Sequence, residues 1–432
     1  MSRSRFIVFT TLVAAMTFAR DGRAQPVPPP QGAEPQPPPE GLQPEPPQPK
    51  PPPEGFRVES ADGEHSLRFG AVVHADQRFL LEGKGTDTFL IRRARPILEA
   101  KIFDYYEFRF QADFAGTQPQ LLDAYGNLHF IDEVQLRVGK GKTPVGLERL
   151  QSPADITFAD RALPTLLVPN RDIGVQLHGK ALKERVEWAV GVYNGVPNGG
   201  SGVTDSNNEK DIAGRIFLRP FIDVGLEPLE GFGIGVAALT GTESGALPSY
   251  TTTAQQTFFD YFDPQGDPGD PTASADGRRW LISPQGYFYY GPVGLLGEYV
   301  HVSEAVQGAA GRRDVVSRAW QIAGSVVLFG GKPSYKGVKV DTPLDPENGS
   351  YGALELAARF HELGVTGAFA IGSADPGASA RHAQAWGVAA NYYFFTRVRA
   401  NATFERTTFG GVQGQDPIQT ESVLTTRLQV AF

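Results

Sequence analysis

The stretch YYEFRFQADF, Tyr105–Phe114, alternates strictly between two kinds of side chain. Its apolar face consists of Tyr106, Phe108, Phe110, Ala112 and Phe114, and its polar face of Tyr105, Glu107, Arg109, Gln111 and Asp113. Strict alternation over ten residues predicts a β-strand with one apolar and one polar face. The same pattern recurs in residues 122–130 and 186–193 and in the last twelve residues, 421–432.

Sixteen such segments can be counted along the chain, and an even number is what a single-chain bacterial outer-membrane barrel requires. Their connections alternate between tight breaks and long loops, which is also typical of these barrels. One break disagrees, because residues 330–350 fall on the short side yet are long, which indicates a missed hairpin or an error in the count. The segments start near residues 66, 88, 105, 121, 133, 173, 186, 210, 231, 280, 293, 314, 351, 382, 397 and 421.

The number of segments also decides which face points inward. A barrel of sixteen strands is too wide for side chains to fill, so its interior holds water. The polar faces must then line this interior, and the apolar faces must meet lipid. We therefore predict an all-β fold for residues 56–432, a transmembrane antiparallel β-barrel of about sixteen strands.

The residues before this region have two different compositions. Residues 1–24 are predicted to be a secretory signal peptide, because Arg3 and Arg5 precede a short apolar run and small residues lead to a cleavage site after Ala24. Residues 25–55 are rich in proline and cannot form a core, which predicts a periplasmic polyproline-II linker. Such a linker could reach the cell wall as a partner.

Composition excludes several classes of function. A net charge of −8 leaves no basic surface for nucleic acid. The chain has no cysteine, which excludes disulfides, thiolate metal sites and a cysteine nucleophile. Its seven histidines have no metal-binding spacing, and no serine lies in a nucleophile-elbow context. We therefore expect no catalytic residue, metal or cofactor, and no enzyme activity.

The longest connection within the first half of the barrel is the loop after the fifth segment, residues 139–172. It contains four prolines and no sustained period. Loops of this length inside a compact domain tend to be functional, and this one can fold into the lumen and narrow it. Its candidate constriction residues are Arg149, Arg161 and Arg171, and its acidic residues are Glu148, Asp155, Asp160 and Asp172.

Arginines are the candidate anion-binding residues of the lumen wall. Arg93 and Arg95 share the polar face of the second segment and could hold an anion through bidentate hydrogen bonds. Arg92 has the opposite parity, which predicts a position at the rim or in a local bulge, whereas Arg109 and Arg137 extend the cationic surface over neighbouring strands. Carboxylates on the same faces leave a second interpretation, in which arginine–carboxylate pairs brace the wall.

Several stretches, taken together, resemble the phosphate-selective porin O and P family. The resemblance implies a sixteen-stranded outer-membrane porin, a homotrimer, an inward-folded third loop and an anion path lined by arginines. It also implies that Arg92 and Arg93 correspond to paired arginines on the second strand and that Phe432 is a signal for barrel assembly. The stretches are FLIRRARPILE (89–99), VGKGKTP (138–144), NRDIGVQL (170–177), VYNG (192–195), GALELAARF (352–360) and the end of the chain, 427–432.

These patterns predict a passive channel in the outer membrane of a Gram-negative cell, with outer-membrane lipid and small anions as partners. It would pass small hydrophilic solutes with a mild anion preference, and phosphate and polyphosphate are the candidate anions. The alternative is a barrel without transport function, acting as a tether through the proline-rich linker or as an adhesion surface. An outer-membrane lipase is a third interpretation.

Overall fold

The computed structural model describes residues 56–202, 208–267, 270–413 and 418–432. The predicted signal peptide, residues 1–24, and the proline-rich linker, residues 25–55, lie outside the described residues. None of the described helices has the length and apolar character needed to span a membrane. The helical elements are short: α1 (Leu147–Leu150), η1 (Leu163–Leu167), η2 (Glu227–Leu229), η3 (Pro346–Asn348) and η4 (Phe369–Ile371).

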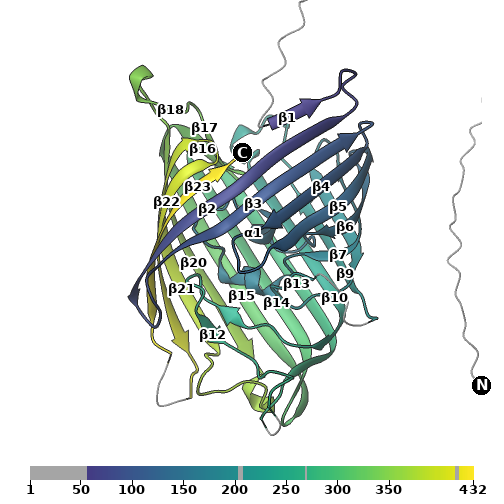
Figure 1. The fold of residues 1–432 in the computed structure, drawn as a ribbon, viewed down its shortest axis with the longest axis vertical. Helices are drawn as coiled ribbons and strands as arrows, with labels where there is room; N and C mark the ends of the chain where they lie inside the picture. Colours follow the sequence, from purple (N-terminus) through teal and green to yellow (C-terminus); the bar gives the residue numbers. More distant parts are fainter. Residues whose placement is uncertain (1–55, 203–207, 268–269, 414–417) are drawn as a thin grey trace, which may run out of the picture. The chain divides into compact units, whose positions relative to one another are not determined.

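Sixteen long strands form a closed ring (Figure 1). Each pairs antiparallel with its neighbours in sequence, and the first and last pair with each other, from Val72 opposite Ala431 to Glu82 opposite Ser422. The strands of the ring are β2 (Ser66–Glu82), β3 (Thr88–Ile102), β4 (Tyr106–Asp113), β5 (Gln120–Ile131), β6 (Val134–Gly141), β7 (Asp172–Ala181), β8 (Val186–Tyr193), β9 (Asp211–Leu218), β10 (Phe232–Gly245), β13 (Ser274–Tyr290), β14 (Val293–Gly308), β15 (Gly311–Phe329), β20 (Ala353–Thr366), β21 (His382–Phe395), β22 (Val398–Gly410) and β23 (Glu421–Ala431).

The predicted closed barrel of sixteen antiparallel strands is therefore confirmed. Fifteen of the sixteen predicted starts lie within three residues of the observed ones. The tenth strand, predicted to start near residue 280, begins six residues earlier at Ser274. The residues before Arg279 include Gly277 and a register shift against β14, and this irregularity interrupts the alternation that marks a strand in the sequence.

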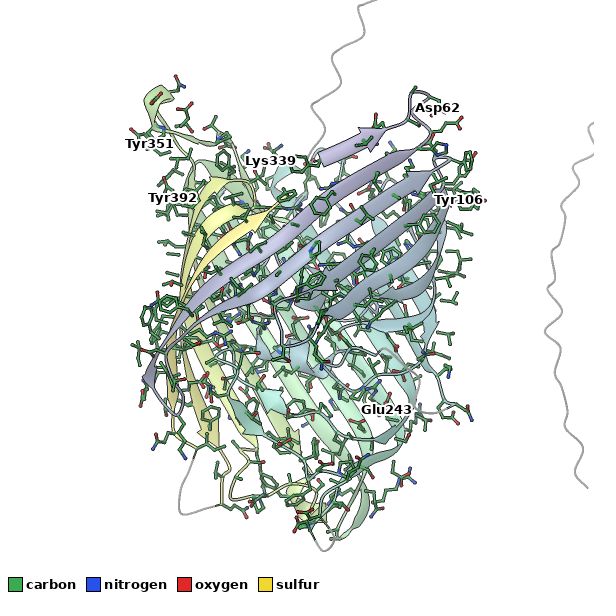
Figure 2. The ribbon with its side chains drawn as sticks, in the orientation of Figure 1. Asp62, Tyr106, Glu243, Lys339, Tyr351 and Tyr392 are labelled. Carbon is green, nitrogen blue, oxygen red and sulfur yellow. The ribbon has the colours of Figure 1, made fainter. Side chains whose placement is uncertain are left out.

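The two faces of the strands differ as the alternation predicts. Phe108 and Phe110 are 48% and 49% exposed on the outside, whereas Gln111, the residue after Phe110, is only 2% exposed. Figure 2 shows Tyr106 and Tyr392 on the outer surface near the same mouth of the barrel, where aromatic rings suit a membrane interface. The outer wall is thus apolar and the inner wall polar.

A short strand extends the sheet where the ring ends. β1 (Phe56–Glu59) pairs with the start of β2, beyond the last residue of β23. The ring of Phe56 contacts that of Phe432 edge-on, with the ring centres 5.6 Å apart. β1 therefore covers the stretch of β2 that β23 leaves without a strand partner.

The long break at residues 330–350 contains a hairpin that the alternation did not reveal. Its strands are β16 (Gly331–Ser334) and β17 (Gly337–Val340), and the strand count of the ring remains sixteen. A second small pair follows, β18 (Leu344–Asp345) with β19 (Ser350–Tyr351), and another, β11 (Tyr250–Thr251) with β12 (Thr257–Phe259), lies in the loop between β10 and β13. Runs of two to four residues are too short to show a period.

The two-faced wall makes a direct prediction for the cysteine-free chain. Single cysteines at Phe108 and Phe110, carrying a polarity-sensitive spin label, should report a hydrocarbon environment because these side chains face lipid. Labels at Arg109 and Gln111 should report water. Accessibility to oxygen and to a water-soluble relaxation agent measures the difference, and equal accessibility at all four sites would contradict the barrel orientation.

Candidate functional site

The connection between β6 and β7, residues 142–171 (the inner loop), crosses the interior of the barrel. Its backbone contacts inward-facing side chains of strands on the opposite wall. Asn391 of β21 donates a hydrogen bond from Nδ2 to the Thr157 carbonyl (3.0 Å), and the Ala159 amide donates to Thr403 Oγ1 of β22 (3.1 Å). Arg427 of β23 donates to the Ala159 carbonyl. The inner loop therefore spans the lumen at mid-barrel, where Figure 1 places α1.

The start of α1 is held by a carboxylate of β14. The first amide groups of a helix have no acceptor within the helix. Glu298 supplies one, since its carboxylate accepts hydrogen bonds from the amides of Leu147 (2.6 Å) and Glu148 (3.4 Å). Gln321 of β15 donates from Nε2 both to Glu298 (2.6 Å) and to the Glu148 carboxylate (3.0 Å). These contacts fix the near end of the inner loop to the wall.

The β16–β17 hairpin approaches the same loop from the other mouth of the barrel, the one at which short turns connect the strands. The Tyr335 hydroxyl donates to the Leu147 carbonyl (2.6 Å), and Gln151 Nε2 donates to the Tyr335 carbonyl (2.8 Å). The ring of Tyr335 also stacks on that of Tyr287 of β13, with 5.1 Å between centres. Two inward-folded segments, one from each mouth, thus meet inside the barrel.

A β-bulge explains how two consecutive arginines on β3 reach one partner. His74 of β2 lies opposite Arg93, and the next residue, Ala75, lies opposite Ile91, so Arg92 has no residue opposite it. An extra residue of this kind changes the direction in which nearby side chains point. Of the two positions predicted for Arg92, the rim and a bulge, the structure shows the bulge.

The partner of these arginines is Asp160 of the inner loop. Its carboxylate forms ion pairs with Arg78 (3.1 Å), Arg92 (3.1 Å) and Arg93 (3.4 Å). Burial alone would raise the pKa of Asp160, but the guanidinium groups of Arg92, Arg93, Arg427 and Arg78 lower it below its usual value. Asp160 is therefore an ionised anchor that ties the loop to β2 and β3. The sequence showed Asp160 only as one of several loop carboxylates.

Two of the predicted wall arginines are paired within the wall. Arg95 contacts Asp113 (2.6 Å), and Arg109 contacts Glu99 and Asp123, the latter at 3.3 Å. All of these residues lie on neighbouring strands, β3 to β5. For Arg95 and Arg109, the bracing interpretation therefore describes the observed contacts.

Arg171 and Arg137 lie further along the same wall. Arg171, at the end of the inner loop, donates from Nε to Asp123 (2.7 Å). The guanidinium of Arg137 lies over the ring of Tyr125, 4.5 Å from its centre, a cation–π contact that leaves its charge uncompensated. No carboxylate within ion-pair distance of Arg137 is found in the described part of the chain.

Arg149 and Arg161 differ from the wall arginines, because they bind carbonyl oxygens. Arg161 donates to the carbonyls of Glu148 (3.0 Å) and Gln151 (2.8 Å), and Arg149 donates to the Thr165 carbonyl and to Asn170 Oδ1 (3.2 Å). Neither forms an ion pair with a carboxylate of the described residues. Burial, with the charges of Arg161 and Arg171, lowers the pKa of Arg149 to about 9. Burial contributes most to this shift, and the neighbouring cations add to it.

A cavity of about 310 Å³ lies between the inner loop and strands β3 to β5. Its described lining contains seven cationic side chains and one carboxylate, Asp113. The cations are Arg92, Arg93, Arg95, Lys142, Arg149, Arg161 and Arg171. Six of them were candidates from the sequence. Lys142 was missed as a site residue, although it lies in the quoted VGKGKTP stretch. Arg109 and Arg137 line a second cavity beyond Arg171.

A closed barrel with an apolar outer wall, a polar lumen and an inward-folded loop defines an outer-membrane porin. The sequence profile of the family "Phosphate-selective porin O and P" matches residues 68–432, and the chain belongs to this family. No curated protein matches its sequence. Family and fold together define an outer-membrane channel.

Solved structures confirm the fold at low sequence identity. The outer-membrane channel DcaP of Acinetobacter baumannii has a TM-score of 0.53 at 10% identity, covering 87% of this chain and 99% of that one. OprB of Pseudomonas putida has a TM-score of 0.51 at 10% identity, covering 86% and 95%. An anion-selective porin from Comamonas acidovorans has a TM-score of 0.50 at 12% identity, covering 85% and 100%.

Asp160→Asn should loosen the inner loop and free positive charge. Removing one partner of a buried ion pair costs about 3–5 kcal/mol, so the temperature at which the barrel unfolds in detergent should fall. Current noise from an open channel should rise, because the loop loses its anchor on β2 and β3. The control is Asp104→Asn, which breaks an exposed pair with Lys101. Equal stability of the two variants would contradict the anchoring role.

Proposed function

We propose that this porin is a passive diffusion channel in the outer membrane of a Gram-negative cell, with a preference for small anions. The observation that carries the proposal is the cavity lined by seven cations and one carboxylate. Charge placed at a narrow point sets the selectivity of a channel. We assign the constriction to the inner loop, with Arg149, Arg161 and Arg171 as its cationic residues.

The contacts suggest how an anion would pass. Arg149 and Arg161 are oriented by carbonyl oxygens and keep their full charge, so an anion can replace water beside them. The neighbouring Arg92 and Arg93, which share the single carboxylate of Asp160 with Arg78, offer further donors on the wall. Conduction requires that an ion binds strongly enough to enter the channel, and that it can leave one site for the next. Successive arginines along the path meet this requirement.

Phosphate is the anion that we propose as a natural solute, with polyphosphate as a longer form. Guanidinium groups present planar forks of N–H donors that match phosphate oxygens two at a time. The cavity offers six such groups within one space. Family membership accords with this choice.

We further propose that the channel is a homotrimer in outer-membrane lipid and that residues 1–24 direct its export. A groove of about 580 Å³ crosses the outer face of β2 and β21–β23. Its lining includes four alanines beside the larger Phe89, Tyr392 and Leu428, and these small side chains would let the barrel of a neighbouring copy approach closely. The alanines are Ala75, Ala390, Ala400 and Ala402.

The anion preference is tested by replacing Arg149 and Arg161 with glutamine. In a planar bilayer under a potassium chloride gradient, the anion-to-cation permeability ratio should fall about threefold, since these cations carry the charge at the constriction. The reversal potential measures this ratio. Wild-type protein that gives no stepwise current would contradict the channel function itself.

The matched control replaces two arginines on the lipid side. Arg318 and Arg406 alternate along their strands with the buried Ser317 and Glu405, so they lie on the outer face. Arg318→Gln with Arg406→Gln removes the same charge but should leave the reversal potential unchanged. If both double variants shift it equally, the selectivity does not arise at the constriction.

The constriction itself is tested by shortening the inner loop. Deleting residues 150–167 should raise the single-channel conductance severalfold, because this segment crosses the lumen. Deleting residues 345–349, around the exposed turn η3, is a control of similar kind and should not change conductance. An unaltered conductance after the first deletion would rule out the loop as the narrowest point.

A further inference from the structure

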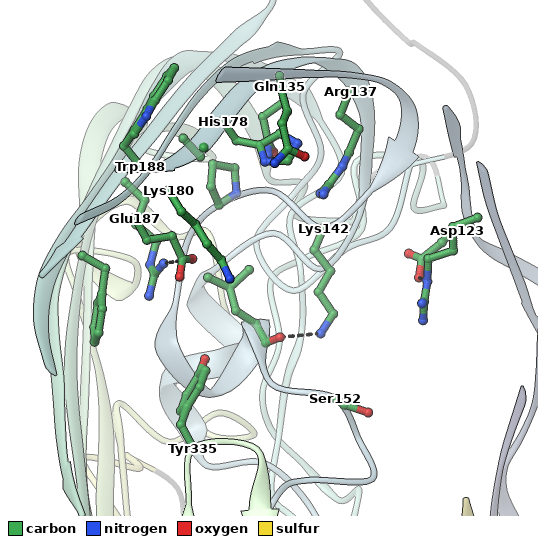
Figure 3. Close-up of a pocket in the computed structure, with 18 of the residues that line it drawn as sticks. Asp123, Gln135, Arg137, Lys142, Ser152, His178, Lys180, Glu187, Trp188 and Tyr335 are labelled. Carbon is green, nitrogen blue, oxygen red and sulfur yellow. Dashed lines mark hydrogen bonds and ion pairs between the residues drawn. The ribbon is translucent and has the colours of Figure 1, made fainter. Parts of the chain in front are cut away.

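A second, larger cavity lies where the inner loop and the β16–β17 hairpin meet (Figure 3). Its volume is about 590 Å³, in the range of about 300–1,000 Å³ that holds organic ligands and far more than inorganic phosphate needs. It shares Lys142 and Arg171 with the smaller cavity, so the two cavities adjoin at these residues. We call it the lower chamber.

The lower chamber is cationic but less uniformly so than the first cavity. Arg215 pairs with Glu187 (2.8 Å) and Lys180 with Glu184 (3.0 Å). Arg137 has only the ring of Tyr125 against its guanidinium. Figure 3 shows Arg137 directed into the chamber, whereas Lys142 extends away from Arg137 and donates from Nζ to the carbonyls of Leu150 (3.0 Å) and Gln151 (2.7 Å). An anionic group would therefore find its strongest contact at Arg137, whose charge is not compensated by a carboxylate of the described residues.

Aromatic rings distinguish the lower chamber from the first cavity, whose described lining has none. Tyr335 and Tyr287 are half-buried and stacked on each other, so each keeps part of its surface toward the chamber. Tyr125 is also half-buried beneath Arg137. A bare inorganic anion gains nothing from such surfaces, whereas the C–H face of a sugar ring packs against them.

The remaining polar groups suit hydroxyls. The chamber is lined by the amides of Gln135 and Gln176 and by the carboxylate of Glu187. Figure 3 places Gln135 beside Arg137 and Glu187 on the wall nearer Tyr335. Glu187 is paired with Arg215 through Oε1, but its carboxylate remains partly exposed and can accept a further hydrogen bond from a ligand hydroxyl.

We propose that the lower chamber is a binding site for phosphorylated sugars. The phosphate would lie against Arg137, and the sugar ring would lie toward Tyr335, with Gln135 and Glu187 near its hydroxyls. The proposal rests on the channel function given above and names a solute class for it. The β16–β17 hairpin then contributes to solute selectivity, because it positions the ring of Tyr335 in the chamber.

The test compares glucose 6-phosphate with inorganic phosphate as blockers of chloride current through single wild-type channels. At about pH 8, above the second pKa of a phosphate ester, about 6, both are mainly dianions. Glucose 6-phosphate should half-block at an about tenfold lower concentration, because its ring adds contacts that phosphate lacks. Uncharged glucose should not block. Equal half-blocking concentrations would overturn the proposal while leaving the anion channel intact.

A variant pair locates the site. Tyr335→Leu keeps an apolar side chain but removes the ring, and it should weaken block by glucose 6-phosphate about fivefold while changing phosphate block less than about twofold. Tyr290→Leu, on the exposed outer face of the neighbouring β13, should change neither. A Tyr335→Leu channel that loses both kinds of block equally would also overturn the proposal. If this variant does not assemble, the wild-type comparison still decides.

Discussion

The rule that no backbone amide can remain unpaired in hydrocarbon governs this structure. A sheet can satisfy it only by closing on itself, and the pairing of β2 with β23 completes that closure. Sixteen strands make a ring too wide for its own side chains to fill. A lumen of this width has room for water and also for inserted backbone, which here is the inner loop and the β16–β17 hairpin. The constriction that we propose depends on this inserted backbone.

Inserted backbone needs anchors that lipid cannot reach, and charged side chains supply them. Asp160 binds arginines of β2 and β3, and Glu298 of β14 binds the start of α1. The chain has a net charge of −8, yet the cavity beside the inner loop is cationic. The acids at the loop are engaged as anchors, while Arg149 and Arg161 are held by carbonyls. Local placement, and not total charge, sets the field that a solute meets.

The sequence predicted most of the wall, since alternation is a local property that lipid on one side and water on the other impose on every strand. It also identified six of the seven cations of the cavity. Strand parity assigned Arg93 and Arg95 to the lumen, and the loop without a period pointed to Arg149, Arg161 and Arg171. Arg92 followed from the resemblance to the family. The sequence could not pair Asp160 with Arg78 or Arg93, which are 82 and 67 residues away. Nor could it show the β16–β17 hairpin or choose the bulge at Arg92, because neither has a periodic signal.

Bracing and selectivity arose from the sequence as competing interpretations of the lumen arginines, but the contacts divide the residues between them. Arg95 and Arg109 hold carboxylates of adjacent strands, so their charge is largely cancelled and their role is to stiffen the wall. Arg149 and Arg161 are fixed by carbonyl oxygens, which orient a guanidinium without neutralising it. A carbonyl-held arginine is rigid and still charged, which is what recognition of a passing anion needs. The partner of each arginine is therefore the basis on which we propose its role, and a single lumen can contain both kinds.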